Sequence, residues 1–222
     1  MFIMIDGIDG SGKSIQAQLL IERLKKESRP VELISFPRYG LKSAAPIEEY
    51  LNGAYGTAEE VGPYRASVLY AIDRFAAAPQ IRQWLKDGKI VVANRYVSSN
   101  MGHQGGKIHD AEERKKFFAW NDNLEYNIFG IPRPDLNIIL HVPADIAQQL
   151  VDKKGEREYL KGAKRDIHEA DMHHLKNAEE TYMEMARSFP NFAIVECVEN
   201  GQLLSIETIH EKIWQVVKGH LK

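Results

Sequence analysis

The chain alternates between short apolar runs and longer segments in which apolar side chains recur every three or four residues. The run at residues 2–6 is apolar and is followed by glycines, which indicates a buried strand. Residues 13–28 combine Ile15, Leu19 and Leu24 with charged side chains on the opposite face, which is typical of an amphipathic helix. The same pattern predicts further strands at residues 31–36, 89–93, 135–142 and 192–198, and further helices at residues 44–53, 63–86, 110–129, 144–153 and 205–220 and in a segment ending near residue 187.

Turn and cap residues indicate where several of these helices begin and end. Pro63 is expected in the first turn of the long helix, where its missing N–H costs nothing, and Gly88 lies just beyond the end. Pro79 falls inside that helix and is expected to kink it. Asp110, with Glu113 three residues later, is expected to cap the helix that follows.

The order of the elements predicts the fold class. Strands alternate with helices along the chain, so we expect βαβ units, whose strands are parallel and whose helices cover both faces of a sheet. No repeat, low-complexity segment or linker interrupts this pattern. The sequence therefore predicts one α/β domain over residues 1–222, with a central parallel five-stranded sheet flanked by helices.

Composition narrows the classes of protein that this fold could serve. Hydrophobic residues make up 44% of the 222 residues and charged residues 27%, which excludes disordered, collagen-like and coiled-coil chains. The single cysteine, Cys197, excludes a disulfide framework and a cysteine-based metal site, so we expect a reducing, cytoplasmic environment. A net charge of −2 argues against a nucleic-acid partner, and the lack of a long apolar run or a leader argues against a membrane partner.

A phosphate-binding loop stands between the first strand and the first helix. Residues 7–14 match the pattern G-x-x-x-x-G-K-[ST] and have the flanking strand and helix that the pattern requires. Glycines let successive backbone N–H groups point at phosphate oxygens, and the helix N-terminus adds a positive dipole end. Lys13 is expected to neutralise the β- and γ-phosphates of ATP, and the Ser14 hydroxyl to bind Mg²⁺. The residues expected to hold the triphosphate are Gly7, Asp9, Gly10, Ser11, Gly12, Lys13, Ser14 and, through its backbone N–H, Ile15.

Two arginines follow neighbouring strands. Arg38 comes just after the predicted second strand and Arg95 just after the third. Ligands of an open α/β sheet bind beyond the carboxyl ends of its strands, so both guanidinium groups are expected beside the phosphate loop. Two converging guanidinium groups suit a phosphate monoester held by paired hydrogen bonds. The sequence thus predicts a second, phosphate-bearing substrate.

With these motifs in place, the sequence resembles the thymidylate kinase family of P-loop nucleoside monophosphate kinases over nearly its whole length. The resemblance rests on IDGIDGSGKS at residues 5–14, FPRY at 36–39, YAIDR at 70–74, NRYVSSN at 94–100, RPDL at 133–136 and a charged segment at about 153–171. It implies a P-loop kinase fold with a short mobile lid at that charged segment. It also implies phosphorylation of dTMP to dTDP with ATP and Mg²⁺, and a homodimer packed through helices.

The resemblance also assigns roles to individual residues. Asp9 matches an acid that contacts the sugar 3′-hydroxyl and helps position Mg²⁺, and Arg74 matches an arginine that contacts a thymine carbonyl. Tyr70 stands where the family usually has a base-stacking Phe, and its ring keeps the stacking face. Asn100 matches a position that hydrogen-bonds the base. The residues expected around the acceptor are Asp9, Phe36, Pro37, Arg38, Tyr39, Tyr70, Arg74, Arg95, Ser99, Asn100 and His103, and those expected at the metal are Ser14 and Asp9.

The charged segment carries the remaining catalytic candidates. Residues 153–165 hold six cations against two acids. Some members of the family have an arginine inside the phosphate loop, where this chain has Gly10 and Ser11, so the resemblance places the catalytic arginine in the lid. Such an arginine would stabilise charge on the transferring group. The residues expected to act in catalysis are Lys13, Asp9, Arg95 and, in the lid, either Arg157 or Arg165.

Three positions depart from the family pattern. Ile15 replaces a Thr and loses a hydroxyl contact to phosphate, and Asn94 replaces an Asp. His103 stands near a Tyr that disfavours a ribose 2′-hydroxyl, which leaves the choice of sugar open. Two alternatives therefore stay open: another nucleoside monophosphate kinase, including one with relaxed base choice, and a nucleotide-binding module with weakened transfer activity.

Overall fold

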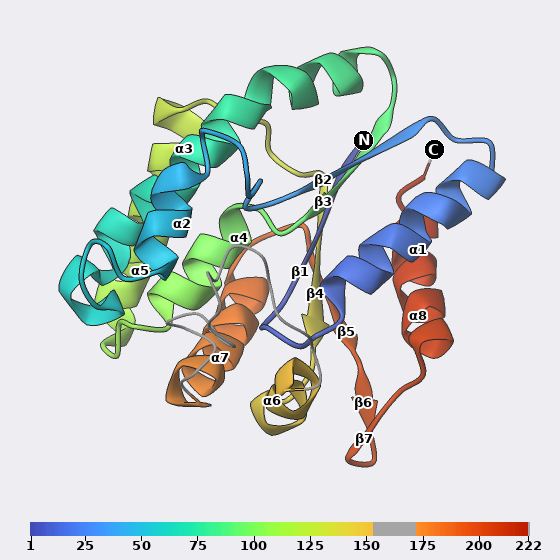
Figure 1. The fold of residues 1–222 in the computed structure, drawn as a ribbon. Coiled ribbons are helices and arrows are strands. Elements are labelled where there is room, and N and C mark those ends of the chain that lie inside the picture. Colours follow the sequence, from blue (N-terminus) through green and yellow to red (C-terminus); the bar gives the residue numbers. More distant parts are fainter. Residues whose placement is uncertain (153–171, 222) are drawn as a thin grey trace.

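The computed structural model describes residues 1–152 and 172–221, and in these residues five parallel strands form the central sheet (Figure 1). The strands are β1 (Phe2–Asp6), β2 (Val31–Ser35), β3 (Ile90–Asn94), β4 (Leu136–His141) and β5 (Phe192–Glu196), in the spatial order β2-β3-β1-β4-β5. β1 lies at the centre and pairs with β3, where Phe2 faces Val91, and with β4, where Ile3 faces Leu136. The predicted parallel five-stranded sheet is confirmed.

Helices cover both faces of the sheet, as the alternation of elements predicted (Figure 1). On one face α1 (Lys13–Lys26) packs against α8 (Ile206–Lys218). The other face carries α3 (Ala58–Lys86), α5 (Ala111–Asp122) and α7 (Met172–Ser188). The shorter elements are α2 (Ala45–Leu51), which packs on α3, α4 (Val97–Ser99), α6 (Ala144–Asp152) and a hairpin of β6 (Val198–Glu199) and β7 (Gln202–Leu203).

The covered sheet explains why the strand segments are continuous apolar runs. A parallel sheet with helices on both faces buries every position of its central strands. Ile3, Met4 and Ile5 of β1 are completely buried, as are Val91 and Val92 of β3. Burial of such side chains contributes about 1.5–3 kcal/mol each to folding, so these strands are the stable support on which the loops at their ends rest. No helix in the described part of the chain is long and apolar enough to cross a membrane.

The long helix α3 begins before the predicted start at Pro63, and a break just before Pro63 separates the extra turn from the predicted helix. It begins earlier, at Ala58, where the Thr57 hydroxyl accepts the N–H of the third helical residue in a capping box. The helix then breaks at Gly62, whose φ of 72° and ψ of 167° are not helical, and Pro63 resumes it. Pro79 keeps helical dihedral angles, so the backbone breaks at Gly62 and not at Pro79, and a bend of the helix axis at Pro79 stays a prediction.

Two π-helical segments were not predicted from the sequence. The segment η1 (Asn100–Gln104) continues α4, and η2 (Asn123–Ile128) continues α5. The helix predicted at residues 110–129 is therefore α5 followed by η2, and it begins as expected, because Asp110 Oδ1 accepts the N–H of Glu113 at 2.9 Å. Single π-helical turns occur frequently at functional sites.

Candidate active site

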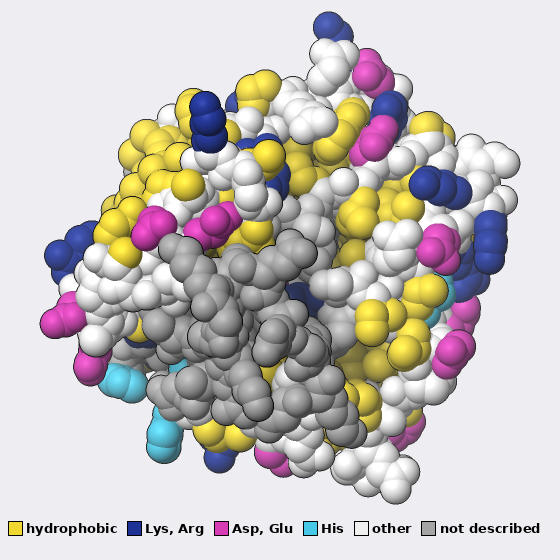
Figure 2. Space-filling view, in the orientation of Figure 1, with side chains coloured by type: hydrophobic (Ala, Val, Ile, Leu, Met, Phe, Trp, Pro, Cys, Tyr) yellow, Lys and Arg dark blue, Asp and Glu magenta, His cyan; other side chains and the backbone are white. Residues whose placement is uncertain are grey.

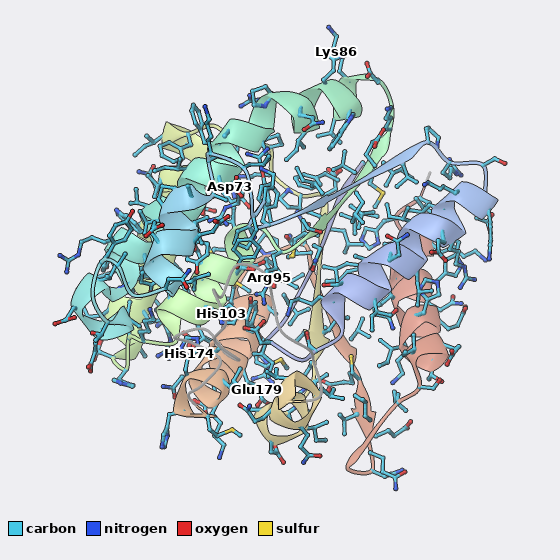
Figure 3. All side chains as sticks on the ribbon, viewed as in Figure 1. Asp73, Lys86, Arg95, His103, His174 and Glu179 are labelled. Atoms are coloured by element: carbon cyan, nitrogen blue, oxygen red, sulfur yellow. The ribbon has the colours of Figure 1, made fainter. Side chains whose placement is uncertain are left out.

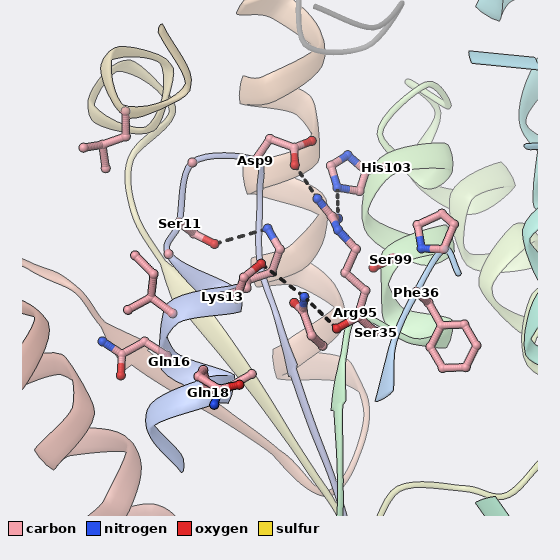
Figure 4. A pocket seen from close by; sticks show the side chains of 18 of the residues that line it. Asp9, Ser11, Lys13, Gln16, Gln18, Ser35, Phe36, Arg95, Ser99 and His103 are labelled. Atoms are coloured by element: carbon pink, nitrogen blue, oxygen red, sulfur yellow. Dashed lines mark hydrogen bonds and ion pairs between the residues drawn. The ribbon is translucent and has the colours of Figure 1, made fainter. Parts of the chain in front are cut away.

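A cavity of about 880 Å³ opens beyond the carboxyl ends of the strands, and its volume is typical of a site for small molecules (Figure 4). Two of the predicted site residues, Gly7 and Arg38, are not among the residues that line it. Arg157 and Arg165 lie outside the described residues. The predicted residues that do line it are Asp9, Gly10, Ser11, Gly12, Lys13, Ser14, Ile15, Phe36, Pro37, Tyr39, Tyr70, Arg74, Arg95, Ser99, Asn100 and His103.

The phosphate loop is packed tightly between β4 and α6. A Cβ atom at Gly7 would lie 2.5 Å from the carbonyl oxygen of Leu140, and one at Gly10 would lie 2.2 Å from that of Ala147. Both glycines also have positive φ angles, of 143° and 87°, that side chains disfavour. The loop backbone can therefore approach these neighbours only because neither position carries a side chain.

Lys13 lies at the mouth of this loop, at the start of α1. Its Nζ donates to the carbonyl oxygen of Ile8 at 2.8 Å and lies 3.5 Å from Ser11 Oγ (Figure 4). The side chain is buried, with 6% of its surface exposed. An ammonium group held over a ring of backbone N–H groups gives the loop the positive potential that a polyphosphate requires.

Arg95 is held by groups from three other elements. It follows β3 with a φ of 65°, in the left-handed region that is uncommon outside glycine, and this turn directs the chain out of the sheet. Its Nη2 donates to Asp9 Oδ1, its Nη1 donates to His103 Nε2 at 3.0 Å, and Nη1 lies 3.9 Å from Asp6 Oδ1 (Figures 3 and 4). Burial alone would lower the pKa of Arg95, but the nearby carboxylates, that of Asp9 above all, raise it, so the guanidinium stays charged.

Asp6 is a buried carboxylate whose two oxygens are already engaged. Oδ2 accepts the hydroxyls of Ser98 and Ser99 at 2.6 and 2.7 Å. Oδ1 accepts the N–H of Gly7 at 2.9 Å and the hydroxyl of Tyr182 at 3.0 Å. With four donors from three segments, Asp6 ties the loop to α4 and α7 and leaves little capacity for a ligand.

His103 forms the second contact of Arg95 and is backed by His174 of α7 (Figure 3). Because Arg95 donates to Nε2, that atom must accept, and the proton of the neutral ring lies on Nδ1. Nδ1 is 3.3 Å from His174 Nε2, and the two rings are stacked with centroids 5.5 Å apart. Burial lowers the pKa of His103 well below its usual value, so the ring stays neutral beside the arginine.

Asn94 joins the end of β3 to the phosphate loop. Its Nδ2 donates to Ser14 Oγ at 3.2 Å and to Ser35 Oγ at 3.4 Å. Its Oδ1 is buried and has no hydrogen-bond partner among the described residues. Mg²⁺ takes oxygen ligands and keeps several of its waters, so the Ser14 hydroxyl, which accepts from the Asn94 amide at the start of α1, fits this ion.

Arg38 is turned toward α3. Its Nε donates to Asp73 Oδ1 at 2.9 Å, and its backbone N–H donates to Asp73 Oδ2 at 2.8 Å. Its Nη2 donates to the Asp73 carbonyl at 2.9 Å and to Ser43 Oγ at 3.0 Å. The structure therefore brings Arg95 to the phosphate loop but does not bring Arg38 to the cavity lining, and its contact with an acceptor phosphate stays a prediction.

The end of the cavity farthest from the loop is built around Arg74. Its side chain is 2% exposed, and Nε and Nη2 donate to the two oxygens of Glu125 at 2.5 and 2.6 Å. Asn100 lies beside this pair and donates from Nδ2 to Glu125 Oε1 at 3.1 Å. Tyr70 and Phe36 supply aromatic walls. Sequence reasoning missed Glu125, whose only signal was a single acid between Leu124 and Tyr126.

The opposite end has an apolar wall that sequence reasoning also missed. Ile15, Leu203 and Ile206 line the cavity with 51%, 40% and 46% of their surfaces exposed, which is unusual for apolar side chains brought together from α1, β7 and α8. Gln16 Nε2 donates to the Ile206 carbonyl at 2.9 Å and holds α8 to α1. An apolar slot next to a phosphate loop suits the flat base of a nucleotide.

Comparisons with known proteins agree with each other. The model of one protein family, described as thymidylate kinase, matches residues 5–213. The thymidylate kinase of Mycobacterium tuberculosis is 31% identical over 187 residues, which covers 84% of this chain and 86% of that protein. A probable thymidylate kinase of Thermococcus onnurineus is 31% identical over 100% of this chain and 98% of its own length. Among solved structures, thymidylate kinase from Candida albicans has a TM-score of 0.75 at 21% identity, covering 99% of this chain and 91% of its own.

Proposed function

The chain belongs to the thymidylate kinase family, and we propose that it transfers the γ-phosphoryl group of ATP to dTMP, forming dTDP and ADP. The observation that carries the assignment to this site is one cavity with a phosphate loop at one end, Arg95 in the middle and a base-sized pocket around Arg74 at the other. Such transfer needs reactants held in line and their charge neutralised, and it requires no covalent intermediate.

For the donor, the phosphate loop binds the triphosphate through its backbone N–H groups and Lys13. The ammonium group exchanges the Ile8 carbonyl, which it contacts at 2.8 Å, for phosphate oxygens. The base of ATP lies in the apolar slot of Ile15, Leu203 and Ile206. These assignments follow from the charge of the loop and the exposed apolar surface next to it.

For the acceptor, the phosphate of dTMP binds to Arg95 and the base binds at Arg74 and Asn100, with Tyr70 stacked on the ring. Arg95 is already charged and is positioned by Asp9 and His103. Its arrangement supports a role in holding the acceptor phosphate against the loop during transfer.

Mg²⁺ would be held by the Ser14 hydroxyl and the Asp9 carboxylate, which both line the cavity. When bound, the ion supplies positive charge to the phosphate oxygens. The residues of the chain position the triphosphate. Ser14 stands in the first turn of α1, and Asn94 holds the Ser14 side chain through its bonds to Ser14 and Ser35. The predicted role on the transferring group stays with one of Arg157 and Arg165.

We also propose that the protein forms a homodimer and acts in the cytoplasm. Hydrophobic side chains gather over α3 and η2 at the upper left of Figure 2. The exposed apolar residues of these two elements include Ile72 and Phe75 of α3 and Ile128 of η2, with 38%, 51% and 66% of their surfaces exposed. Exposed apolar residues on packed helices are the kind of surface that a subunit contact buries.

ADP release on a panel of dTMP, dUMP, dCMP, dGMP and UMP tests this function. We expect the highest kcat/KM for dTMP, and a matched Lys13→Ala protein that stays folded and releases little ADP with any acceptor. ATP binding without turnover of any acceptor would contradict the proposal and favour a nucleotide-binding module. Equal turnover of several acceptors would favour a kinase of relaxed base choice.

A further inference from the structure

Glu125 contacts two residues of the base pocket at once without lining the cavity itself. Its side chain is fully buried, and its carboxylate accepts two hydrogen bonds from Arg74. Its Oε1 also accepts from Asn100 Nδ2. One carboxylate thus sets the orientation of both side chains, although it lies 51 residues from one and 25 from the other along the chain.

The two bonds from Arg74 to Glu125 determine which N–H groups of Arg74 face the cavity. Glu125 occupies the edge formed by Nε and Nη2, and a guanidinium held by two parallel bonds cannot rotate. Among the described residues, Nη1 has no acceptor, and Arg74 lines the cavity. Arg74 therefore presents Nη1–H groups to a ligand. Burial would lower the pKa of Arg74, but Glu125 raises it, so this donor stays charged.

The bonds around Asn100 determine the orientation of its amide. Nδ2 lies among three acceptors: the Ser67 carbonyl at 3.0 Å, Glu125 Oε1 at 3.1 Å and Asn121 Oδ1 at 3.3 Å. The reverse orientation would place Oδ1 against a carboxylate and a carbonyl, which repel it. Oδ1 is therefore the amide atom left to the cavity, where it presents an acceptor.

We propose that Glu125 is a positioning residue that makes this pocket select a lactam edge, that is, a ring carbonyl next to a ring N–H. A donor from Arg74 beside an acceptor from Asn100 pairs with O4 and N3–H of thymine or uracil. Cytosine presents an amino group and an unprotonated ring nitrogen at these places, so donor would meet donor and acceptor would meet acceptor. The inference rests on the proposed function, because it explains how the acceptor of that reaction is chosen.

The test compares kcat/KM for dTMP and dCMP, at saturating ATP, in the wild-type protein and in Glu125→Gln, Glu125→Asp and Asp122→Asn. Glutamine at this position keeps the size of Glu125, but an NH₂ group, which cannot accept a hydrogen bond from Arg74 or Asn100, replaces one of the two carboxylate oxygens. Glutamine also carries no charge to hold Asn100. We expect the dTMP to dCMP ratio to fall at least about tenfold in Glu125→Gln, mainly through KM for dTMP, with KM for ATP unchanged. Glu125→Asp, which keeps the charge on a shorter side chain, is expected to lie between this variant and the wild type.

Asp122→Asn is the matched control. Asp122 binds Arg133 through two bonds of 2.7 Å, as Glu125 binds Arg74, but at the surface and away from the cavity. We expect this variant to keep the wild-type ratio. Variants at Glu125 that are less stable to urea but keep the wild-type ratio would overturn the proposal, because Glu125 would then serve folding alone. If Glu125→Gln does not fold, the ratio in Glu125→Asp decides.

Failure of the proposed function has a different readout, namely a wild-type protein that releases no ADP with dTMP. Calorimetric binding of dTMP and dCMP to the same variants still decides the role of Glu125 in that case. A preference for dTMP that falls in Glu125→Gln supports the proposal, and a preference that persists in both Glu125 variants overturns it.

Discussion

Arg74 and Arg95 both line the cavity, and each is paired with a carboxylate. The two pairs differ in the exposed fraction of their side chains and in whether the carboxylate itself lines the cavity. The side chains of Arg74 and Glu125 are 2% and 0% exposed, and Glu125 lies on η2, outside the cavity lining. The side chains of Arg95 and Asp9 are 19% and 17% exposed, and Asp9 belongs to the phosphate loop itself. Glu125 is thus a dedicated partner, whereas Asp9 is shared with the nucleotide site.

This difference indicates what each arginine can do. A guanidinium paired with a dedicated, fully buried carboxylate has a fixed direction, and the pair has no net charge, which suits hydrogen bonding to an uncharged base. A guanidinium whose partner is partly exposed, as Asp9 is, can exchange that partner for a phosphate, which suits binding an anion. Stability should therefore depend most on the Arg74 pair and activity most on the Arg95 pair.

The largest expected effect is on stability. Arg74→Met leaves Glu125 buried without a partner and should lower the free energy of unfolding by about 3–5 kcal/mol. Arg95→Met should cost clearly less, because Asp9 can turn to water. Urea unfolding of both variants measures the difference, and the double variant Arg74→Met/Glu125→Met, which removes both charges, should recover most of the loss. Equal losses in the two single variants would contradict the contrast between the pairs.

The next effect is on activity. Arg95→Met should lower kcat/KM for dTMP by about 10²- to 10³-fold, the range seen when a positioned donor to transition-state charge is removed. Lys13→Ala should cause a loss of similar size from the donor side while the protein stays folded. Steady-state kinetics with circular dichroism as a folding control provide the measurement. An Arg95→Met enzyme with wild-type kcat/KM would remove Arg95 from the acceptor site.

The parallel sheet and the phosphate loop could be predicted because their signals are local. Continuous apolar runs, the glycine pattern of residues 7–14 and the Asp110 cap each lie within a few residues of the feature they specify. The π-helical segments could not be predicted, because a helix with one wider turn keeps nearly the same apolar spacing as an ordinary one. Pro63 was expected to begin the long helix, and the break at Gly62 agrees with that start, whereas the turn that precedes it from Ala58 was not predicted.

The pairing of charges was the part of the site that the sequence did not reveal. Arg74 was expected to contact a base carbonyl, but nothing local indicates that Glu125 holds it. Arg38 was expected beside Arg95, and the structure instead ties it to Asp73 of α3. A strand end places a residue near the cavity, whereas the direction of a long side chain depends on partners that are distant in sequence.

A smaller effect is expected when a carboxylate is added near the Arg95–Asp9 pair. Asn94→Asp adds a carboxylate at the end of β3, near Ser14, where the family pattern has an acid. Because Asp6 is saturated by four donors, Asp9 is the acid left to act at this end, so we expect Asp9→Asn to abolish most activity. Asn94→Asp should raise kcat by a few-fold at most. A gain approaching 10²-fold would show that the natural protein lacks a positioned acid.

The smallest effect concerns a cation that can lose its charge, unlike either arginine. His141 contacts Glu196 at 2.6 Å and Glu179 at 3.0 Å. Burial lowers its pKa, but the bonds to the two carboxylates outweigh burial and raise it. A raised pKa means that the stabilisation is full below the unfolded value of about 6.5 and is lost as pH rises through the folded pKa.

Urea unfolding from pH 6 to 9 measures this contribution. His141→Gln keeps hydrogen-bonding capacity but cannot titrate, so we expect it to be less stable than the wild type at pH 6 and nearly equal at pH 9. A difference between the two proteins that does not change over this range would exclude the titration of His141 as its cause.

The contact between Gly10 and Ala147 limits the routes by which this protein can evolve. A side chain at position 10 would have to displace α6, since even a Cβ atom would lie 2.2 Å from the Ala147 carbonyl oxygen. A residue other than glycine would also have to adopt the φ of 87° that position 10 requires. Because α6 leads directly into the segment predicted to carry the catalytic arginine, Arg157 or Arg165, a side chain at position 10 would move the helix from which that segment starts. We therefore expect glycine to be the only residue that position 10 accepts without loss of the loop and of α6.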